Sequence, residues 1–174
     1  DKAVSSGFDV FVSSSDASAK DNSDYTAVQN AKATFVGNAG ETQTISFNVT
    51  DDNTVESSET FTLVLSSVTS TSLNNDDFDL SDEATVTIID NDAATLAIND
   101  VTKAENANGA TTGFTFSVTL TGAVQEPFTV QYATNLASAR ENDFTATDGT
   151  LNFTGNNGEA RTFDVTVLDD DIVE

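Results

Sequence analysis

The sequence predicts an all-β protein built from antiparallel β-sandwich modules, and three observations support this fold class. Hydrophobic residues alternate with Thr or Ser in many short runs, clusters of Gly, Asn and Asp separate these runs, and a set of motifs occurs twice. Period-two alternation is typical of strands that bury one face. No stretch carries a sustained apolar stripe at 3.6-residue spacing, so we expect almost no helix.

The expected strands follow one another along the whole chain, most of them with Val, Ile, Leu or Phe at every second position. Clusters such as Gly37–Gly40 and Gly155–Gly158 lie between them and provide the left-handed backbone that hairpin turns need. The expected strands are Phe8–Val12, Thr44–Val49, Thr60–Leu65, Thr85–Ile89, Thr95–Ile98, Phe114–Leu120, Phe128–Tyr132, Thr150–Phe153 and Thr162–Val167.

An internal repeat predicts the domain organisation. Asp24-Tyr25-Thr26-Ala27 returns as Asp143-Phe144-Thr145-Ala146, and Gly40-Glu41 returns as Gly158-Glu159. A unit of this size is what a sandwich of about seven short strands requires. The two modules are predicted to be residues 1–92 and 93–174, in head-to-tail tandem.

Each copy of the repeat is incomplete within this sequence. Residues 93–127 have no counterpart ahead of the first copy, and residues 57–92 have none in the second. The first module should therefore lack its first strands, and the second should lack its last. Missing strands leave sheet edges unpaired, so we expect the native protein to continue at both ends.

Composition excludes several classes of function. The 174 residues include 29 acidic and 6 basic ones, for a formal charge of −23, and no His or Cys. Nucleic acid is excluded as a partner because phosphate binding needs clustered Lys and Arg. Without His and Cys, the usual general base, thiol nucleophile, zinc site and disulfide are all absent. No apolar run approaches 18 residues, so no direct membrane insertion is expected.

The motifs resemble those of the Calx-beta domain, the immunoglobulin-like sandwich of sodium/calcium exchangers, integrin β4 and many large bacterial surface proteins. Both copies contribute to the resemblance, and it covers essentially the whole chain. The motifs of the first copy are Asp24-Tyr25, Gly40-Glu41-Thr42, the acidic run Asp51–Phe61 and Asp90-Asn91-Asp92; those of the second are Glu105, Asp143-Phe144, Gly158-Glu159 and Asp169–Glu174.

The resemblance implies that Ca²⁺ binds to acidic loops at one end of each sandwich. Calcium takes six to eight oxygen ligands, largely carboxylates, and clustered carboxylates repel each other unless a cation neutralises them. Glu59 is a further candidate, and solvated surface acids that bind no metal are the alternative. The implied ligands are Asp24, Asp51, Asp52, Glu56, Asp90 and Asp92 in the first copy, and Glu105, Asp143, Asp169, Asp170 and Glu174 in the second.

The expected function is that of a non-catalytic, calcium-binding structural repeat in a large extracellular adhesin or surface filament, of bacterial type, whose module junctions calcium stiffens. Its expected partners are neighbouring repeats, and a surface receptor or glycan. A ligand- or carbohydrate-binding adhesion module and a calcium-sensing regulatory domain are the alternatives. An enzyme is not expected, because paired catalytic carboxylates need distinct environments inside a cleft.

Overall fold

The computed structural model describes residues 3–104 and 109–169, which form two compact units. Unit 1 comprises Asp1–Asp52 and Ser57–Asp90, and unit 2 comprises Asn53–Glu56 and Asn91–Glu174. The short segment 53–56 belongs with unit 2 because β3 (Thr54–Val55) pairs in parallel with β8 (Ala123–Val124). The regular elements of both units are strands, apart from one 3₁₀ turn, which confirms the predicted all-β class. Among the described residues, no helix is long and apolar enough to cross a membrane.

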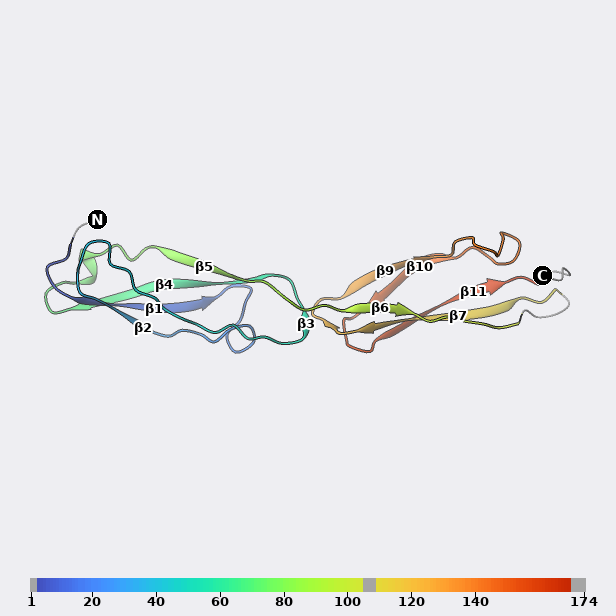
Figure 1. Cartoon of the computed structure of the whole chain (residues 1–174), viewed down its shortest axis with the longest axis horizontal. Coiled ribbons are helices and arrows are strands. Elements are labelled where there is room, and N and C mark those ends of the chain that lie inside the picture. Colours follow the sequence, from blue (N-terminus) through green and yellow to red (C-terminus); the bar gives the residue numbers. More distant parts are fainter. Residues whose placement is uncertain (1–2, 105–108, 170–174) are drawn as a thin grey trace. The chain divides into compact units, whose positions relative to one another are not determined.

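Unit 1 is built on one antiparallel sheet with the strand order β2-β1-β4-β5 (Figure 1). The long strand β4 lies between β1 and β5, and a β-bulge interrupts its pairing with β1 after Phe11. A single 3₁₀ turn lies between β4 and β5. The bounds are β1 Phe8–Asp16, β2 Ala31–Phe35, β4 Glu59–Ser70, the turn Asn75–Asp77 and β5 Glu83–Ile88.

One buried cluster in the core of unit 1 gathers around an aromatic side chain of β4. Phe61 is fully buried, its ring stacks on that of Tyr25 with centroids 3.9 Å apart, and Phe47 meets it edge-on at 5.3 Å. Ala19 is also fully buried in this cluster. The loop that follows β1 therefore folds back over β4, and Phe61 holds the two together.

Unit 2 is a sandwich of two small antiparallel sheets, of order β11-β7-β6 and β10-β9 (Figure 1). Val118 and Leu120 from the first sheet pack against Leu151 and Phe153 from the second, and all four are buried. The bounds are β6 Thr95–Ile98, β7 Thr112–Thr121, β9 Phe128–Ala133, β10 Asp148–Phe153 and β11 Ala160–Val167.

The sequence repeat produces the same local pairing in both units. In unit 1, Phe8 of β1 faces Phe35 of β2, and their rings stack 5.1 Å apart. In unit 2, Phe128 of β9 faces Phe153 of β10, and their rings stack 5.2 Å apart. Strands β1 and β9 are therefore counterparts, as are β2 and β10.

One expected strand does not form, and several short ones were not predicted. The segment Thr44–Val49 contains only an isolated bridge between Val49 and Tyr25. Its counterpart in unit 2, β11, pairs along its whole length with β7, and the first copy contains no counterpart of β7. The alternating pattern is present, but the ladder partner is missing. The unpredicted strands are β2, β3 and β8.

Candidate metal centre

Asp24 lies in the loop between β1 and β2, and backbone hydrogen bonds on both sides hold it in place. The amide of Lys20 donates to Asp24 Oδ2 at 2.6 Å, and the amide of Thr50 donates to the Asp24 carbonyl at 2.9 Å. The neighbouring Tyr25 is buried in the core beside Phe61. The buried ring thus anchors the loop while the adjacent carboxylate stays half-buried at the surface.

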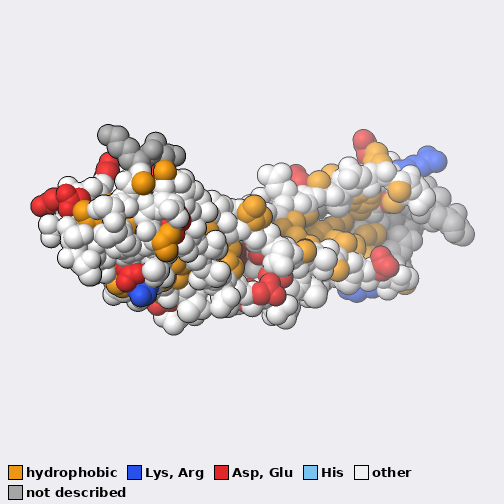
Figure 2. Space-filling model, turned by 60° about the vertical axis from the view of Figure 1, so that its left-hand side comes forward, with side chains coloured by type: hydrophobic (Ala, Val, Ile, Leu, Met, Phe, Trp, Pro, Cys, Tyr) orange, Lys and Arg blue, Asp and Glu red, His pale blue; other side chains and the backbone are white. Residues whose placement is uncertain are grey.

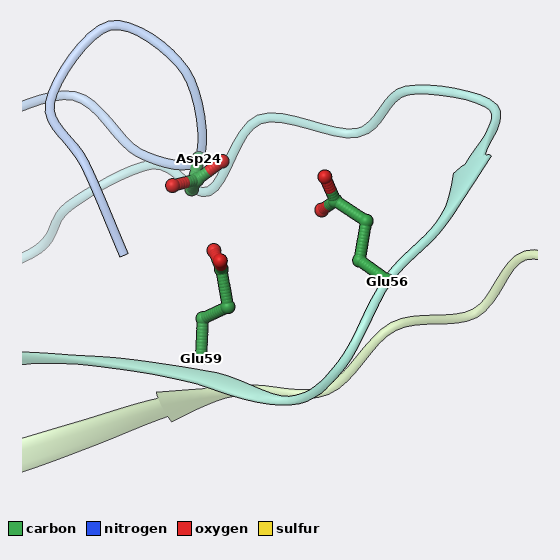
Figure 3. Close-up of side chains that lie close together, drawn as sticks. All are labelled: Asp24, Glu56 and Glu59. Atoms are coloured by element: carbon green, nitrogen blue, oxygen red, sulfur yellow. The ribbon is translucent and has the colours of Figure 1, made fainter. Parts of the chain in front are cut away.

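Two glutamates accompany Asp24 where the chain enters β4. Glu59 is the first residue of β4, where it pairs with Ile88 of β5, and Glu56 precedes it by three residues. Carboxylate oxygens of Asp24, Glu56 and Glu59 all lie within 4.8 Å of one another, and Figure 3 shows the three side chains directed toward a common space.

The spacing of these oxygens fits one calcium ion. Calcium–oxygen distances of 2.3–2.6 Å place two ligands on opposite sides of the ion about 4.6–5.2 Å apart, and closer when they are adjacent. The donor set contains oxygen only, which suits a hard cation better than zinc or copper. All three side chains are half-buried, which leaves room for further ligands from the protein or from water.

Four other acids implied by the resemblance lie outside this cluster of Asp24, Glu56 and Glu59. Within residues 3–104 and 109–169, three carboxylates come this close to one another at one place, the cluster itself. Glu59, the further candidate, is a member of it, as are two of the six implied ligands of the first copy. Asp51 and Asp52 are exposed between the segment 44–49 and β3, and Asp90 and Asp92 are half-buried after β5.

The second copy reproduces the aspartate loop but not the whole cluster. The amide of Arg140 donates to Asp143 Oδ2 at 2.6 Å, as Lys20 does to Asp24, and the amide of Leu168 donates to the Asp143 carbonyl at 2.8 Å. Asp169 accepts a hydrogen bond from the amide of Gly109. The second copy has no counterpart of Glu59 in this sequence. Glu105, Asp170 and Glu174 lie outside the described residues.

Two acids that occupy equivalent positions in the two copies of the repeat stabilise turns and are not part of the cluster. Glu41 accepts hydrogen bonds from the amides of Val36, Gly37 and Asn38 at 3.0–3.3 Å, and these bonds, that from Val36 first, hold the pKa of its carboxyl below the usual value. Its counterpart Glu159 accepts from the amides of Thr154 and Gly155. The glutamate of the Gly-Glu motif therefore stabilises a turn. Its carboxylate accepts hydrogen bonds from backbone amides that have no partner in a neighbouring strand.

A polar contact that the sequence pattern does not indicate links the loop of Asp24 to β1. The Tyr25 hydroxyl donates to Asp16 Oδ1 at 2.8 Å, and this bond is the main cause that lowers the pKa of Asp16. Burial, in turn, raises the pKa of the Tyr25 hydroxyl. The two residues are nine positions apart without regular spacing, so only the folded loop reveals the pair.

Comparison with known proteins supports a family assignment. The Calx-beta domain family matches residues 2–92 and again residues 99–174. A search of curated proteins found no match. Solved structures similar to this chain include the calcium binding domain CBD12 of CALX1.1, with 22% identity and a TM-score of 0.42 over 94% of this chain, and CBD12 from CALX1.2, with 20% identity and a TM-score of 0.41 over 99%. The chain spans 64% and 67% of their lengths, respectively. Because the family match covers nearly all of the sequence in two successive segments, the chain belongs to the Calx-beta family as a tandem of two domains.

Proposed function

We propose that this chain is a non-catalytic, calcium-binding structural repeat of a large extracellular adhesin or surface filament. Calx-beta domains bind Ca²⁺, and the cluster of Asp24, Glu56 and Glu59 provides a matching set of oxygen ligands. This cluster is the observation that carries the proposal. The chain's excess of acids over bases adds to it, because a bound cation relieves repulsion among the carboxylates.

Calcium at the cluster stabilises the fold of unit 1. Asp24 belongs to the loop after β1, whereas Glu59 begins β4, so one ion held by both carboxylates links two segments that are distant in sequence. A ligand that binds only the folded state stabilises that state by mass action. Phe61 lies two residues after Glu59 and packs on Tyr25, beside Asp24, so the ion reinforces a contact that the core already makes.

We further propose that calcium limits bending between successive domains. Asp90-Asn91-Asp92 follows β5 closely, and β6 begins at Thr95, so the connection is only a few residues long. A short connection leaves little freedom between modules. In this proposal the partners are neighbouring repeats of the same chain, with a surface receptor or glycan as a further partner, on a cell surface of bacterial type.

Thermal melting tests whether calcium binds at the cluster. The melting temperature should rise with millimolar CaCl₂ and fall back with EGTA, by an amount that corresponds to about 0.4–1.4 kcal/mol when calcium is at about 1–10 times its Kd. Asp24→Asn and Glu59→Gln should each lose most of the calcium-dependent shift. Glu83→Gln, an exposed acid of β5, is the matched control and should keep it. An unchanged melting temperature in the parent chain would contradict calcium binding.

The calcium affinity separates an extracellular repeat from a regulatory sensor. Extracellular modules bind calcium with Kd values of about 10⁻⁴–10⁻³ M, whereas intracellular sensors need about 10⁻⁷–10⁻⁵ M. Isothermal titration calorimetry should give a Kd in the weaker range. A micromolar or tighter Kd would overturn the extracellular role and favour calcium sensing. Small-angle scattering tests the stiffening: equal distributions of dimensions with and without calcium would argue against it.

A further inference from the structure

The turn between β10 and β11 contains an Asn-Gly pair, Asn157-Gly158. Both residues are exposed, and Gly158 has a positive φ of +80°. A glycine has no Cβ to shield its backbone nitrogen, so this nitrogen can approach the side-chain amide of the residue before it. The pair therefore places a potential nucleophile, Gly158 N, next to an electrophilic carbon, Asn157 Cγ.

The reaction that this pair can undergo is deamidation. Gly158 N gives its proton to solvent and forms a bond to Asn157 Cγ, the bond from Cγ to the side-chain nitrogen breaks, and ammonia leaves with a proton from solvent. The product is a cyclic imide, and water opens it. Cleavage between Gly158 N and Cγ gives aspartate, whereas cleavage between Gly158 N and the backbone carbonyl carbon of residue 157 gives isoaspartate. Water is the co-reactant, and no electrons are transferred.

In the folded protein, hydrogen bonds to β7 hold both reacting groups. The Gly158 amide donates to the Leu120 carbonyl at 2.9 Å, and the Leu120 amide donates to the Glu159 carbonyl at 2.8 Å. These two bonds continue the ladder of β7 and β11 past the first residue of β11. Asn157 Oδ1 accepts a hydrogen bond from the Gly122 amide at 3.0 Å. Attack requires the proton that Gly158 N shares with Leu120, so this end of the ladder has to open first.

The surroundings of the ladder end oppose its opening. Leu120 is 1% exposed and packs in the core with Leu151 and Phe153. On the side of the turn, the Glu159 carboxylate accepts hydrogen bonds from the amides of Thr154 and Gly155. The Asn-Gly pair lies between these two sets of contacts. Its reactivity therefore depends on the packing of unit 2, although the turn itself is exposed.

We propose that Asn157 is a deamidation site controlled by the end of the β7–β11 ladder. The closed ladder suppresses the reaction, and each opening allows irreversible conversion of Asn157 to aspartate or isoaspartate. Local openings have free energies between zero and that of global unfolding. The extent of modification thus reports how often this end of unit 2 opens. The site shares no residue with the cluster of Asp24, Glu56 and Glu59, so the proposal does not depend on calcium binding.

The two products have different effects on the turn. Aspartate keeps the backbone unchanged, and its carboxylate can accept the hydrogen bond from Gly122, strengthened by the charge. Isoaspartate adds a methylene group to the backbone, which displaces Gly158 from Leu120 and keeps the ladder end open. Each product also adds a negative charge to a chain with 29 acidic and 6 basic residues, and Figure 2 shows acidic side chains at several places on one face.

The rest of the sequence supplies an unreactive equivalent and one pair that has to be removed. In the turn of unit 1, Ala39 occupies the position equivalent to Asn157, so that turn has no Asn-Gly pair. The second Asn-Gly pair of the sequence is Asn108-Gly109, and Asn108 lies outside the described residues. An Asn108→Ala background therefore leaves Asn157-Gly158 as the reporting pair.

Peptide mapping by mass spectrometry tests the proposal in this background, with a synthetic peptide of residues 152–163 as the reference in the same buffer. Asn157 should deamidate at least about tenfold more slowly in the folded chain than in the peptide, because hydrogen bonds and core contacts must break before the attack. Leu120→Ala removes a buried side chain behind the ladder end. It should raise the deamidation rate and the hydrogen-exchange rate of the Gly158 amide by the same factor, at least about tenfold.

Two further variants separate control by the ladder from other causes. Phe61→Ala removes a fully buried side chain of unit 1 and should leave both rates unchanged. Asn157→Asp should exchange the Gly158 amide as slowly as the parent chain, whereas isoaspartate-containing chains should exchange it faster. If Leu120→Ala unfolds unit 2, its deamidation rate should equal that of the peptide.

Several results would overturn the proposal. Equal deamidation rates in the folded parent chain and the peptide would show that the ladder gives no protection. A deamidation rate that stays constant in Leu120→Ala while exchange of the Gly158 amide accelerates would show that opening does not control the reaction. A faster reaction in the folded chain than in the peptide would mean that the Gly122 amide activates Asn157 Cγ through Oδ1.

Discussion

The two units share their local motifs but differ in what closes their cores. Unit 1 contains β4, and Phe61 completes a buried cluster with Tyr25 and Ala19. Unit 2 has the equivalent loop with Phe144 and Ala139, but a groove stands in place of the phenylalanine. Conversely, unit 2 has β7 to pair with β11, whereas the counterpart of β11 in unit 1 remains without a ladder.

This difference shows which structural features depend only on residues close in sequence and which depend on a neighbouring strand. The loops of Asp24 and Asp143 have the same hydrogen bonds although one is covered by β4 and the other is open. The turns of Glu41 and Glu159 also match, because each carboxylate binds amides only a few residues away. Hydrogen bonds between residues close in sequence therefore form with or without a neighbouring strand. A segment such as Thr44–Val49, in contrast, does not become a strand without a partner strand.

The largest expected effect is the loss of the side chain that distinguishes the two cores. Phe61→Ala should destabilise unit 1 by about 3–5 kcal/mol, because it removes a fully buried ring and leaves a cavity among Tyr25, Phe47 and Ala19. Hydrogen exchange followed by unit should show faster exchange in β1 and β4, with β7 and β11 unchanged. Val49→Ala, at a side chain that is 48% exposed, is the control. Unchanged exchange in β4 would contradict this role of Phe61.

A smaller effect is expected at the turn that the repeat shares. Gly155 has φ +96°, and a Cβ there would collide with the Val124 carbonyl oxygen, so Gly155→Ala should cost more than about 2 kcal/mol in unit 2. Gly158 has φ +80° with open space around it, so Gly158→Ala should cost only about 1 kcal/mol. Urea denaturation measures both, and equal costs would show that the contact with Val124 is unimportant.

The two turn glutamates should make a modest contribution that depends on pH. Partial burial acts to raise the pKa of Glu159, but hydrogen bonds from Thr154 and Gly155 and the charge of Arg161 bring it below the usual value of 4.5. A lowered pKa in the folded state means that the stabilisation is complete above about pH 4.5 and is lost as the pH falls through the folded-state value.

Glu159→Gln should therefore lower the stability of unit 2 at pH 7, and the difference from the parent chain should shrink toward pH 3. Glu41→Gln should behave in the same way in unit 1, since the pKa of Glu41 is also lowered. Urea denaturation at a series of pH values measures both. The control Glu126→Gln, at an exposed acid, should show no such trend. A difference that stays constant with pH would contradict the role of the charged carboxylate.

The smallest expected effect concerns the polar pair that only unit 1 has. Tyr25→Phe removes the hydroxyl that donates to Asp16 and should cost about 1 kcal/mol. Adding Asp16→Leu installs the Phe and Leu of unit 2, and a double-mutant cycle should show that the two changes are coupled. Strict additivity in urea denaturation would mean that the hydrogen bond does not contribute to stability.

Much of the fold and part of the site could be predicted from the sequence. The strand Thr95–Ile98 was predicted with its bounds as observed, and β1, β4, β5, β7, β9, β10 and β11 were located, because alternation within a strand is a local signal. The cluster of Asp24, Glu56 and Glu59 draws on residues that the family resemblance singled out. The bond between Tyr25 and Asp16 could not be predicted, since no regular spacing relates the two residues.

The sequence by itself determined the all-β class, the turn chemistry and the two copies of each motif, since alternation, glycine turns and short-range hydrogen bonds act over a few residues. Only the tertiary structure decided that Thr44–Val49 stays outside a ladder, that Phe61 stacks on Tyr25, and that three acids meet. Each of these depends on which segment lies alongside. A strand needs a partner for its backbone groups and a core needs a side chain from the facing element, and neither requirement is encoded within the segment itself.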